Sequence, residues 1–186
     1  LANLGTAAQH VTQLPEGPIG DAAVRELCAE GVDTRHVLRR GTRMGLYFLE
    51  SGADVRPLRV VYDREHSAFS QLEPADFDWT SILRGARWLH LCGISPALGR
   101  GPLQCVHDAL DAAAAHGIPV SLDLNYRPAL WGARDPRPIM QPLAARASLL
   151  IANPGAISAM LGLTTPGTAP EEPAALQLTA DALQRD

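Results

Sequence analysis

A carboxylate, an amide and a guanidinium lie close together near the middle of the chain. Asp123, Asn125 and Arg127 all fall in the run Asp-Leu-Asn-Tyr-Arg, which continues an apolar stretch at residues 120–122. At the mouth of a sheet, such a carboxylate can hold a hydrated Mg²⁺ and the arginine can clamp an anion. An Asp or Asn at a strand-to-helix turn can equally well cap the next helix without any chemistry. The local pattern leaves both interpretations open.

A second candidate cluster lies on two runs of alternating polarity, residues 45–50 and 58–64, joined by the turn signal Ser-Gly-Ala-Asp at 51–54. This pattern predicts a hairpin that stands out from the main body, because a central strand would be more uniformly apolar. Tyr62 and Arg64 share one face of their strand. With Tyr47 on the partner strand, two phenols and a guanidinium could grip a polyhydroxy acid. Ordinary cross-strand pairing on an exposed sheet explains the same residues.

A third cluster is the run His-Leu-Cys-Gly-Ile-Ser at residues 90–95. Gly93, directly after a predicted strand, would let a ligand come close to the backbone, and a plain turn explains it equally well. The six histidines have no metal-ligand spacing, and Cys28, Cys92 and Cys105 form no C-x-x-C pair. The sequence therefore predicts neither a zinc site nor a disulfide framework.

Composition narrows the class of protein. All 16 basic residues are arginine, so the chain itself has no lysine for a Walker-A phosphate loop or for Schiff-base chemistry. The net charge of −4 is interspersed, without the basic patch that nucleic acid requires. No apolar run approaches the roughly 20 residues of a membrane span. We expect a cytoplasmic protein with a small-molecule ligand and no nucleic-acid or membrane partner.

These clusters need a scaffold, and strand signals alternate with helix signals along most of the chain. Strands are expected at residues 8–14, 32–40, 87–91, 120–124 and 149–152. Helices are expected at residues 20–31, 78–85, 101–116, 135–145, 154–161 and 173–185. Such alternation predicts βαβ units and a mostly parallel α/β sheet, whose ligands bind beyond the carboxyl ends of the strands. Gly93, Asp123, Asn125 and Asn153 should therefore meet at one edge.

The motifs G-L-Y-F-L-E, V-V-Y-D-R-E-H-S-A, H-L-C-G-I-S-P-A-L and S-L-D-L-N-Y-R-P-A-L-W occur in this order. In order and spacing they resemble the ribokinase-type (PfkB) carbohydrate kinases, and most closely the 2-keto-3-deoxygluconate kinases. The resemblance covers most of residues 1–162. It implies a three-layer α/β/α sandwich with a small β-lid at residues 44–64, and residues 1–186 would be part of that kinase domain. It also implies ATP and Mg²⁺ as cofactors, phosphorylation of the 6-hydroxyl of 2-keto-3-deoxygluconate, and homo-oligomers formed through the lid.

The same resemblance assigns roles to individual residues. The expected substrate-binding residues are Tyr47, Tyr62, Arg64, Ile94 and Arg127. The expected phosphate and metal region consists of Asp123, Asn125 and Asn153, with Asp123 facing the metal.

Three departures from the family pattern stand out. The Gly-Gly substrate motif would lie before Leu1, and the G-A-G-D motif with the catalytic base Asp would lie beyond Asp186. The N-x-x-E motif reads Asn-Pro-Gly-Ala, so that Ala156 stands where the family has an acid.

Three alternatives compete with this reading. A kinase for fructose or ribose is one, although Arg64 and Arg127 favour an acidic sugar over a neutral one. A sugar-acid-binding protein without catalysis is the second, since Ala156 removes an acid that helps to organise Mg²⁺. A Rossmann dehydrogenase is the third, and it would need a G-x-G-x-x-G after a strand, which the chain lacks.

We predict that residues 1–186 alone catalyse no phosphoryl transfer. The base and the anion hole of the family pattern lie outside this segment, and stabilisation of developing charge is usually the largest catalytic contribution. A coupled assay for ADP release, with 2-keto-3-deoxygluconate and ATP, measures this directly. Sustained turnover by the isolated 186-residue chain would contradict the prediction.

Overall fold

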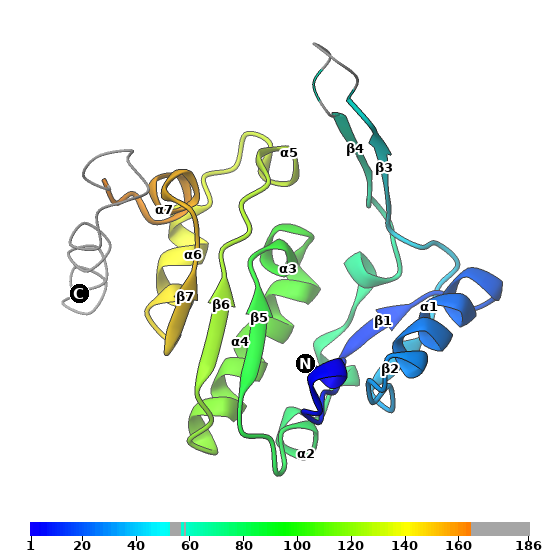
Figure 1. Cartoon of the computed structure of the whole chain (residues 1–186). Coiled ribbons are helices and arrows are strands. Elements are labelled where there is room, and N and C mark those ends of the chain that lie inside the picture. Colours follow the sequence, from blue (N-terminus) through cyan, green and yellow to red (C-terminus); the bar gives the residue numbers. More distant parts are fainter. Residues whose placement is uncertain (53–56, 58, 165–186) are drawn as a thin grey trace. The chain divides into compact units, whose positions relative to one another are not determined.

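The computed structural model describes residues 1–52, 57 and 59–164, and the chain divides into two compact units (Figure 1). The first unit is Leu1–Asp76 and the second is Phe77–Asp186. The helix expected at 173–185 and part of the turn expected at 51–54 lie outside the described residues.

The first unit begins with a short 3₁₀ helix, η1 (Ala2–Leu4), which is followed by a βαβ element. Strands β1 (Thr12–Leu14) and β2 (Val37–Arg39) pair in parallel and are joined by helix α1 (Pro18–Ala29). Both strands are shorter than expected, and an isolated bridge between Gln9 and Asp33 is all that extends the pairing toward their amino ends. Helix α1 starts on a proline, whose missing N–H costs nothing in the first turn.

The second part of the first unit is the predicted hairpin. Strands β3 (Leu46–Glu50) and β4 (Arg59–Asp63) pair antiparallel, with Tyr47 directly opposite Tyr62. All five residues of β3 are exposed, as a hairpin that stands out from a core requires. Two 3₁₀ helices follow, η2 (Phe69–Gln71) and η3 (Pro74–Asp76).

The second unit is a three-stranded parallel sheet in the order β5-β6-β7, which confirms the parallel alignment predicted for these strands. The strands are β5 (Leu89–Cys92), β6 (Val120–Asp123) and β7 (Leu149–Ile151). The helices are α2 (Trp79–Ile82), α3 (Ile94–Ala97), α4 (Arg100–Ala115), α5 (Pro128–Trp131), α6 (Arg137–Ala144) and α7 (Pro154–Leu161). Helices α3 and α5 have four residues each and were not predicted.

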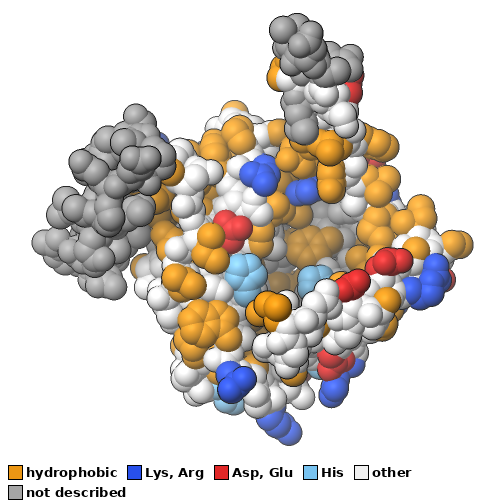
Figure 2. Space-filling view, viewed as in Figure 1, with side chains coloured by type: hydrophobic (Ala, Val, Ile, Leu, Met, Phe, Trp, Pro, Cys, Tyr) orange, Lys and Arg blue, Asp and Glu red, His pale blue; other side chains and the backbone are white. Residues whose placement is uncertain are grey.

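The sheet of the second unit is buried on one face. Val120, Leu122 and Leu124 join the main core, to which α4, α6 and α7 contribute, and α4 and α6 lie behind the strands in Figure 1. Trp88, Leu149 and Ile151 are 50%, 49% and 45% exposed, and in Figure 2 hydrophobic side chains are visible over the strands. The register places Leu149 and Ile151 on the same face as Ser121 and Asp123, opposite the core.

Parallel strands joined by helices confirm the predicted α/β class. Among the described residues, none of the helices is long and apolar enough to cross a membrane.

Candidate functional site

The carboxyl ends of β5, β6 and β7 are held together by hydrogen bonds that continue past the strands. The backbone N–H of Gly93 donates to the carbonyl of Asp123 at 2.7 Å, and the N–H of Leu124 donates to the carbonyl of Ile151 at 2.9 Å. These bonds fix the three turns relative to one another. The edge therefore brings together Gly93, Asp123 and Asn125, with Asn153 two residues past β7, as the alternation of strands and helices predicted.

Gly93 is required by the neighbouring backbone. A Cβ atom at this position would lie 2.3 Å from the carbonyl oxygen of Leu124 and 3.2 Å from that of Asp123. Real Cβ atoms do not approach so closely, so any side chain would push the β5 and β6 turns apart. The sequence suggested that a ligand comes close to Gly93, and what comes close in the structure is the backbone of the turn after β6.

The turn after β6 has its own internal geometry. Asn125 has a φ of 41°, in the left-handed region that Asn tolerates better than most residues. Its N–H donates to Asp123 Oδ1 at 3.0 Å, and its side-chain amide donates to Cys92 Sγ at 3.2 Å. These contacts give Asp123 and Asn125 a structural role in the turn. Their assignment to phosphate and metal stays a prediction.

Arg127 is exposed at the start of helix α5. Among the described residues, its guanidinium makes one hydrogen bond, at 3.1 Å to the carbonyl of the adjacent Tyr126. Four of its five N–H donors are therefore free to meet a ligand, as far as the described residues are concerned. This position suits the predicted capture of an anionic group.

Arg134 holds the two unpredicted helices together. Its Nη2 donates to the carbonyls of Ala97 in α3 and Leu130 in α5, both at 2.7 Å. Its guanidinium carbon lies 5.3 Å from the ring centroid of Trp131. Since α3 starts at Ile94 and α5 follows Arg127, this contact positions the two helices that carry predicted substrate residues. Sequence gave no signal for Arg134, because its partners are backbone carbonyls.

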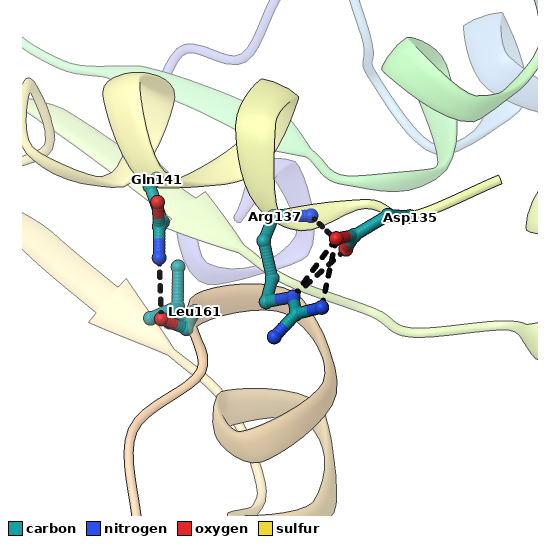
Figure 3. Close-up of polar contacts among 4 residues, drawn as sticks. All are labelled: Asp135, Arg137, Gln141 and Leu161. Atoms are coloured by element: carbon teal, nitrogen blue, oxygen red, sulfur yellow. Dashed lines mark hydrogen bonds and ion pairs between the residues drawn. The ribbon is translucent and has the colours of Figure 1, made fainter.

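Asn153 serves as the N-cap of α7. Its side-chain oxygen accepts a hydrogen bond from the N–H of Ala156 at 2.8 Å, so a polar residue at this strand end does cap the next helix. The other end of α7 is fixed by Gln141 of α6, whose amide donates to the carbonyl of Leu161 at 2.7 Å (Figure 3). The phosphate role predicted for Asn153 stays a prediction.

Helix α6 begins with an ion pair that Figure 3 also shows. Arg137 bonds the carboxylate of Asp135 through both its side chain and its backbone N–H. The side-chain hydrogen bond from Arg137 lowers the pKa of Asp135 below its ordinary value, with the backbone bond as a second cause. Both side chains are exposed, at 53% for Arg137 and 45% for Asp135, so the pair adds little stability.

On the hairpin, the predicted residues gather on one face. Tyr47 and Tyr62 are directly opposite each other, and the guanidinium carbon of Arg64 lies 4.8 Å from the centroid of the Tyr62 ring. Phe48 pairs with Val61 on the other face, where they are 57% and 45% exposed. The hairpin therefore has an apolar outer face that includes Phe48.

The hairpin belongs to the first unit, and Ile94 and Arg127 belong to the second. The joint binding of one substrate by Tyr47, Tyr62, Arg64, Ile94 and Arg127 stays a prediction.

A metal site at the strand ends would rest on Asp123. Within the described parts of the chain, no group of three or more His, Cys, Asp or Glu side chains is placed to hold a metal ion. Mg²⁺ usually keeps several waters and is bound by one or two carboxylates together with substrate phosphates, so a single carboxylate at this edge fits it. Asp123 Oδ1 accepts the Asn125 N–H, and Oδ2 has no hydrogen-bond partner in the described part of the chain.

Comparison with protein families decides the kinship of this chain. The model of the pfkB family carbohydrate kinases matches residues 1–184. The chain belongs to the pfkB family. The fold and the order of motifs described above agree with this membership.

Individual relatives are similar over most of the chain. The 2-dehydro-3-deoxygalactonokinase of Haloferax volcanii is 31% identical over 162 residues, which are 87% of this chain and 51% of that protein. The 5-dehydro-2-deoxygluconokinase of Geobacillus kaustophilus is 34% identical over 148 residues, 78% of this chain and 43% of that protein. The crystal structure of a 2-dehydro-3-deoxygluconokinase from Thermotoga maritima matches with a TM-score of 0.91 at 43% identity, covering 99% of this chain and 56% of that one. The chain thus spans about half the length of these pfkB relatives.

We predict that Gly93→Ala destabilises the protein by about 1–3 kcal/mol, the usual cost of forcing an extra carbon into a packed site. The added Cβ must displace the carbonyl of Leu124. Urea denaturation of the whole protein measures the loss.

Gly155→Ala is the matched control at the same edge. A Cβ at this position would lie 3.4 Å from Asn153 Oδ1, an ordinary contact distance, and alanine favours the helix. Equal unfolding midpoints for the two variants would contradict the close approach at Gly93.

Proposed function

We propose that the whole protein transfers the γ-phosphoryl group of ATP to a keto sugar acid, with 2-keto-3-deoxygluconate as the acceptor and its 6-phosphate as the product. The observation that carries the proposal is the hairpin face formed by Tyr47, Tyr62 and Arg64. Arg64 is stacked on Tyr62 and forms no ion pair with the described residues, so its charge remains available for a ligand. An arginine fork matches a carboxylate, which a neutral sugar lacks.

The names of the relatives support an acidic acceptor. The three proteins compared above are named for 2-dehydro-3-deoxygalactonate, 5-dehydro-2-deoxygluconate and 2-dehydro-3-deoxygluconate. All three are dehydro-deoxy sugar acids, which favours this class over fructose or ribose. The Thermotoga protein has the highest identity of the three, 43%, and supports the choice of 2-keto-3-deoxygluconate.

In this proposal the hairpin at residues 44–64 acts as a lid over the sugar acid. The hydroxyls of Tyr47 and Tyr62 hydrogen-bond the substrate's oxygens, and Arg64 approaches its carboxylate from the lid. Arg127 binds the same carboxylate from the carboxyl edge of β6, and Ile94 packs on the carbon skeleton. A closed lid excludes water, which strengthens these polar contacts and protects the phosphoryl group from hydrolysis.

The phosphate region of the proposal lies on the same edge. Asp123 would hold Mg²⁺ through its free carboxylate oxygen and bound water, and Asn125 and Asn153 would face the phosphates. The metal neutralises charge on the transferring phosphates when it is bound. Positioning of the acceptor by the arginines then supplies much of the remaining catalysis, since phosphoryl transfer depends mainly on alignment and charge.

A second candidate function is sugar-acid binding without catalysis. Ala156 favours it, because the family pattern has an acid there that helps to organise Mg²⁺. A coupled ADP-release assay on the whole protein separates the two candidates. Turnover with the keto acid supports the kinase, whereas tight binding of the acid without ADP release supports the binder.

The outer face of the hairpin suggests self-association. Leu46, Phe48 and Val61 are 40%, 57% and 45% exposed on the face opposite the tyrosines. We propose a homo-oligomer that buries this apolar face through the lid.

We predict that Arg127→Leu lowers kcat/KM for the keto acid at least about a hundredfold, because a carboxylate left without its partner in a closed site costs several kcal/mol. The loss should be far smaller for an analogue in which the carboxylate is reduced to an alcohol. Arg64→Leu should act in the same direction but more weakly, since a lid residue is more exposed to solvent. Steady-state kinetics with both substrates provides the measurement.

Arg84→Leu is the control, because Arg84 is an exposed arginine that precedes β5 at the other end of the sheet. It should leave both kcat/KM values unchanged. Equal losses for the acid and the alcohol in Arg127→Leu would remove the physical basis of the keto-acid assignment.

A further inference from the structure

The hairpin is joined to the rest of the first unit by two short segments, residues 41–45 before β3 and residues 64–68 after β4. We call these segments the hairpin feet. Because every residue of β3 is exposed and no residue of β4 is buried, the direction in which the hairpin points is determined at its feet. Any residue that fixes the feet also fixes the side chains that the hairpin presents.

Gln13 of β1 holds one foot from the interior of the unit. Its side chain is 1% exposed, and its amide donates to the carbonyl of Ala68 at 2.7 Å. The N–H of Ala68 in turn donates to the carbonyl of Arg43 at 2.8 Å, which ties the second foot to the first. A continuous chain of hydrogen bonds therefore runs from β1 through both feet.

Arg43 joins the feet a second time through its side chain. Its guanidinium bonds the carboxylate of Asp63 and the carbonyl of Glu65. Asp63 is directly opposite Leu46, so its side chain lies on the face away from Tyr62 and Arg64. Arg43 is therefore committed to the hairpin base, while Arg64 on the other face stays available.

The buried side chain of Gln13 stabilises the fold less than an apolar side chain of the same size would. Its Oε1 is buried and has no hydrogen-bond partner among the described residues. A buried, unpaired polar atom carries a desolvation cost that an apolar side chain of the same size avoids. The favourable contribution of this amide is therefore the hydrogen bond that its N–H group donates to the carbonyl of Ala68.

We propose that Gln13 and Arg43 are positioning residues that fix the hairpin feet, so that recognition of the sugar acid by Tyr47, Tyr62 and Arg64 depends on two residues that do not touch it. This inference rests on the proposed lid function of the hairpin. It predicts an effect on the acceptor and none on ATP, because the feet lie in the unit that carries the hairpin.

The test uses Gln13→Met in the whole protein, since methionine has a similar volume and lacks the amide. Two measurements are made: hydrogen exchange of the backbone amides of residues 46–50 and 59–63, and steady-state kinetics. We expect faster exchange in the hairpin and a KM for the keto acid raised about tenfold, equivalent to ~1.4 kcal/mol. kcat and the KM for ATP should stay at their original values.

Arg43 gives a second route that does not depend on a core substitution, because its side chain is 38% exposed. Arg43→Asp should raise the KM for the keto acid, and the charge-swapped double variant with Asp63→Arg should recover most of it. Gln104→Met is the control: Gln104 is exposed on α4 and, among the described residues, its side chain bonds only Asp108 of the same helix, so neither measurement should change.

The outcomes are distinguishable. Unchanged hairpin exchange in Gln13→Met overturns the positioning role, whatever the activity of the protein. Faster exchange with an unchanged KM for the acid shows that Gln13 holds the hairpin but that the hairpin does not bind the acid, which overturns the inference together with the proposed lid. A fall in kcat together with a rise in both KM values, or no recovery in the charge-swapped variant, would indicate general structural damage and also overturn the inference.

Discussion

Every candidate residue of the second unit depends on the parallel register of β5, β6 and β7. Parallel strands that pair in register end at the same edge, and here the pairing continues past the strands through the N–H groups of Gly93 and Leu124. The turns cannot shift independently, so the carboxylate of Asp123 keeps its place between the ends of β5 and β7. The constraint is steric as well as polar, because only glycine fits at position 93. A site built on such an edge is rigid before any ligand arrives.

The arginines of this lysine-free chain divide into those that hold the fold and those that remain available. Arg39 bonds the carbonyls of Pro15 and Gly17 and pairs with Asp21, and Arg134 clasps α3 and α5. These guanidiniums act as multidentate clamps on backbone oxygens, a task that a lysine ammonium performs less well. Arg64 and Arg127 differ because, within the described residues, neither guanidinium joins distant parts of the chain: Arg64 lies over the Tyr62 ring, and Arg127 bonds the carbonyl of the adjacent Tyr126. They are also the two that the family resemblance assigns to the substrate.

Sequence reasoning found the elements whose signals are long or strongly punctuated. The bounds of α7, Pro154–Leu161, were predicted to the residue because a cap, a proline and a terminal glycine mark them. Helices α3 and α5 were missed because a four-residue helix is too short to show a 3.6-residue period. The strand expected at 32–40 is only Val37–Arg39 in the structure, because apolar content alone does not show at which residue strand pairing begins.

Candidate residues were easier to find than their partners. The sequence identified Asn153 and Asp123 as polar groups at strand ends, but it could not show that the Asn153 oxygen is used in capping α7 or that the Asp123 carboxylate accepts the Asn125 N–H. It gave no sign of Gln13, a polar residue in a short strand, as the anchor of the hairpin. Such roles depend on contacts between residues far apart in the chain, and local patterns carry no information about them.

Ala156 shows how the fold limits the chemistry of this edge. It is 2% exposed and belongs to the core beneath α7, so an acidic side chain there would have to reach out of an apolar environment or be buried at a large cost. The N–H of Ala156 is already satisfied by Asn153, which means that the cap needs no reciprocal acid to be stable. The carboxylate that the family pattern has at this position is therefore absent without a structural penalty. What the described residues offer a cation at this edge is the second oxygen of Asp123, together with whatever water and phosphate a bound nucleotide brings.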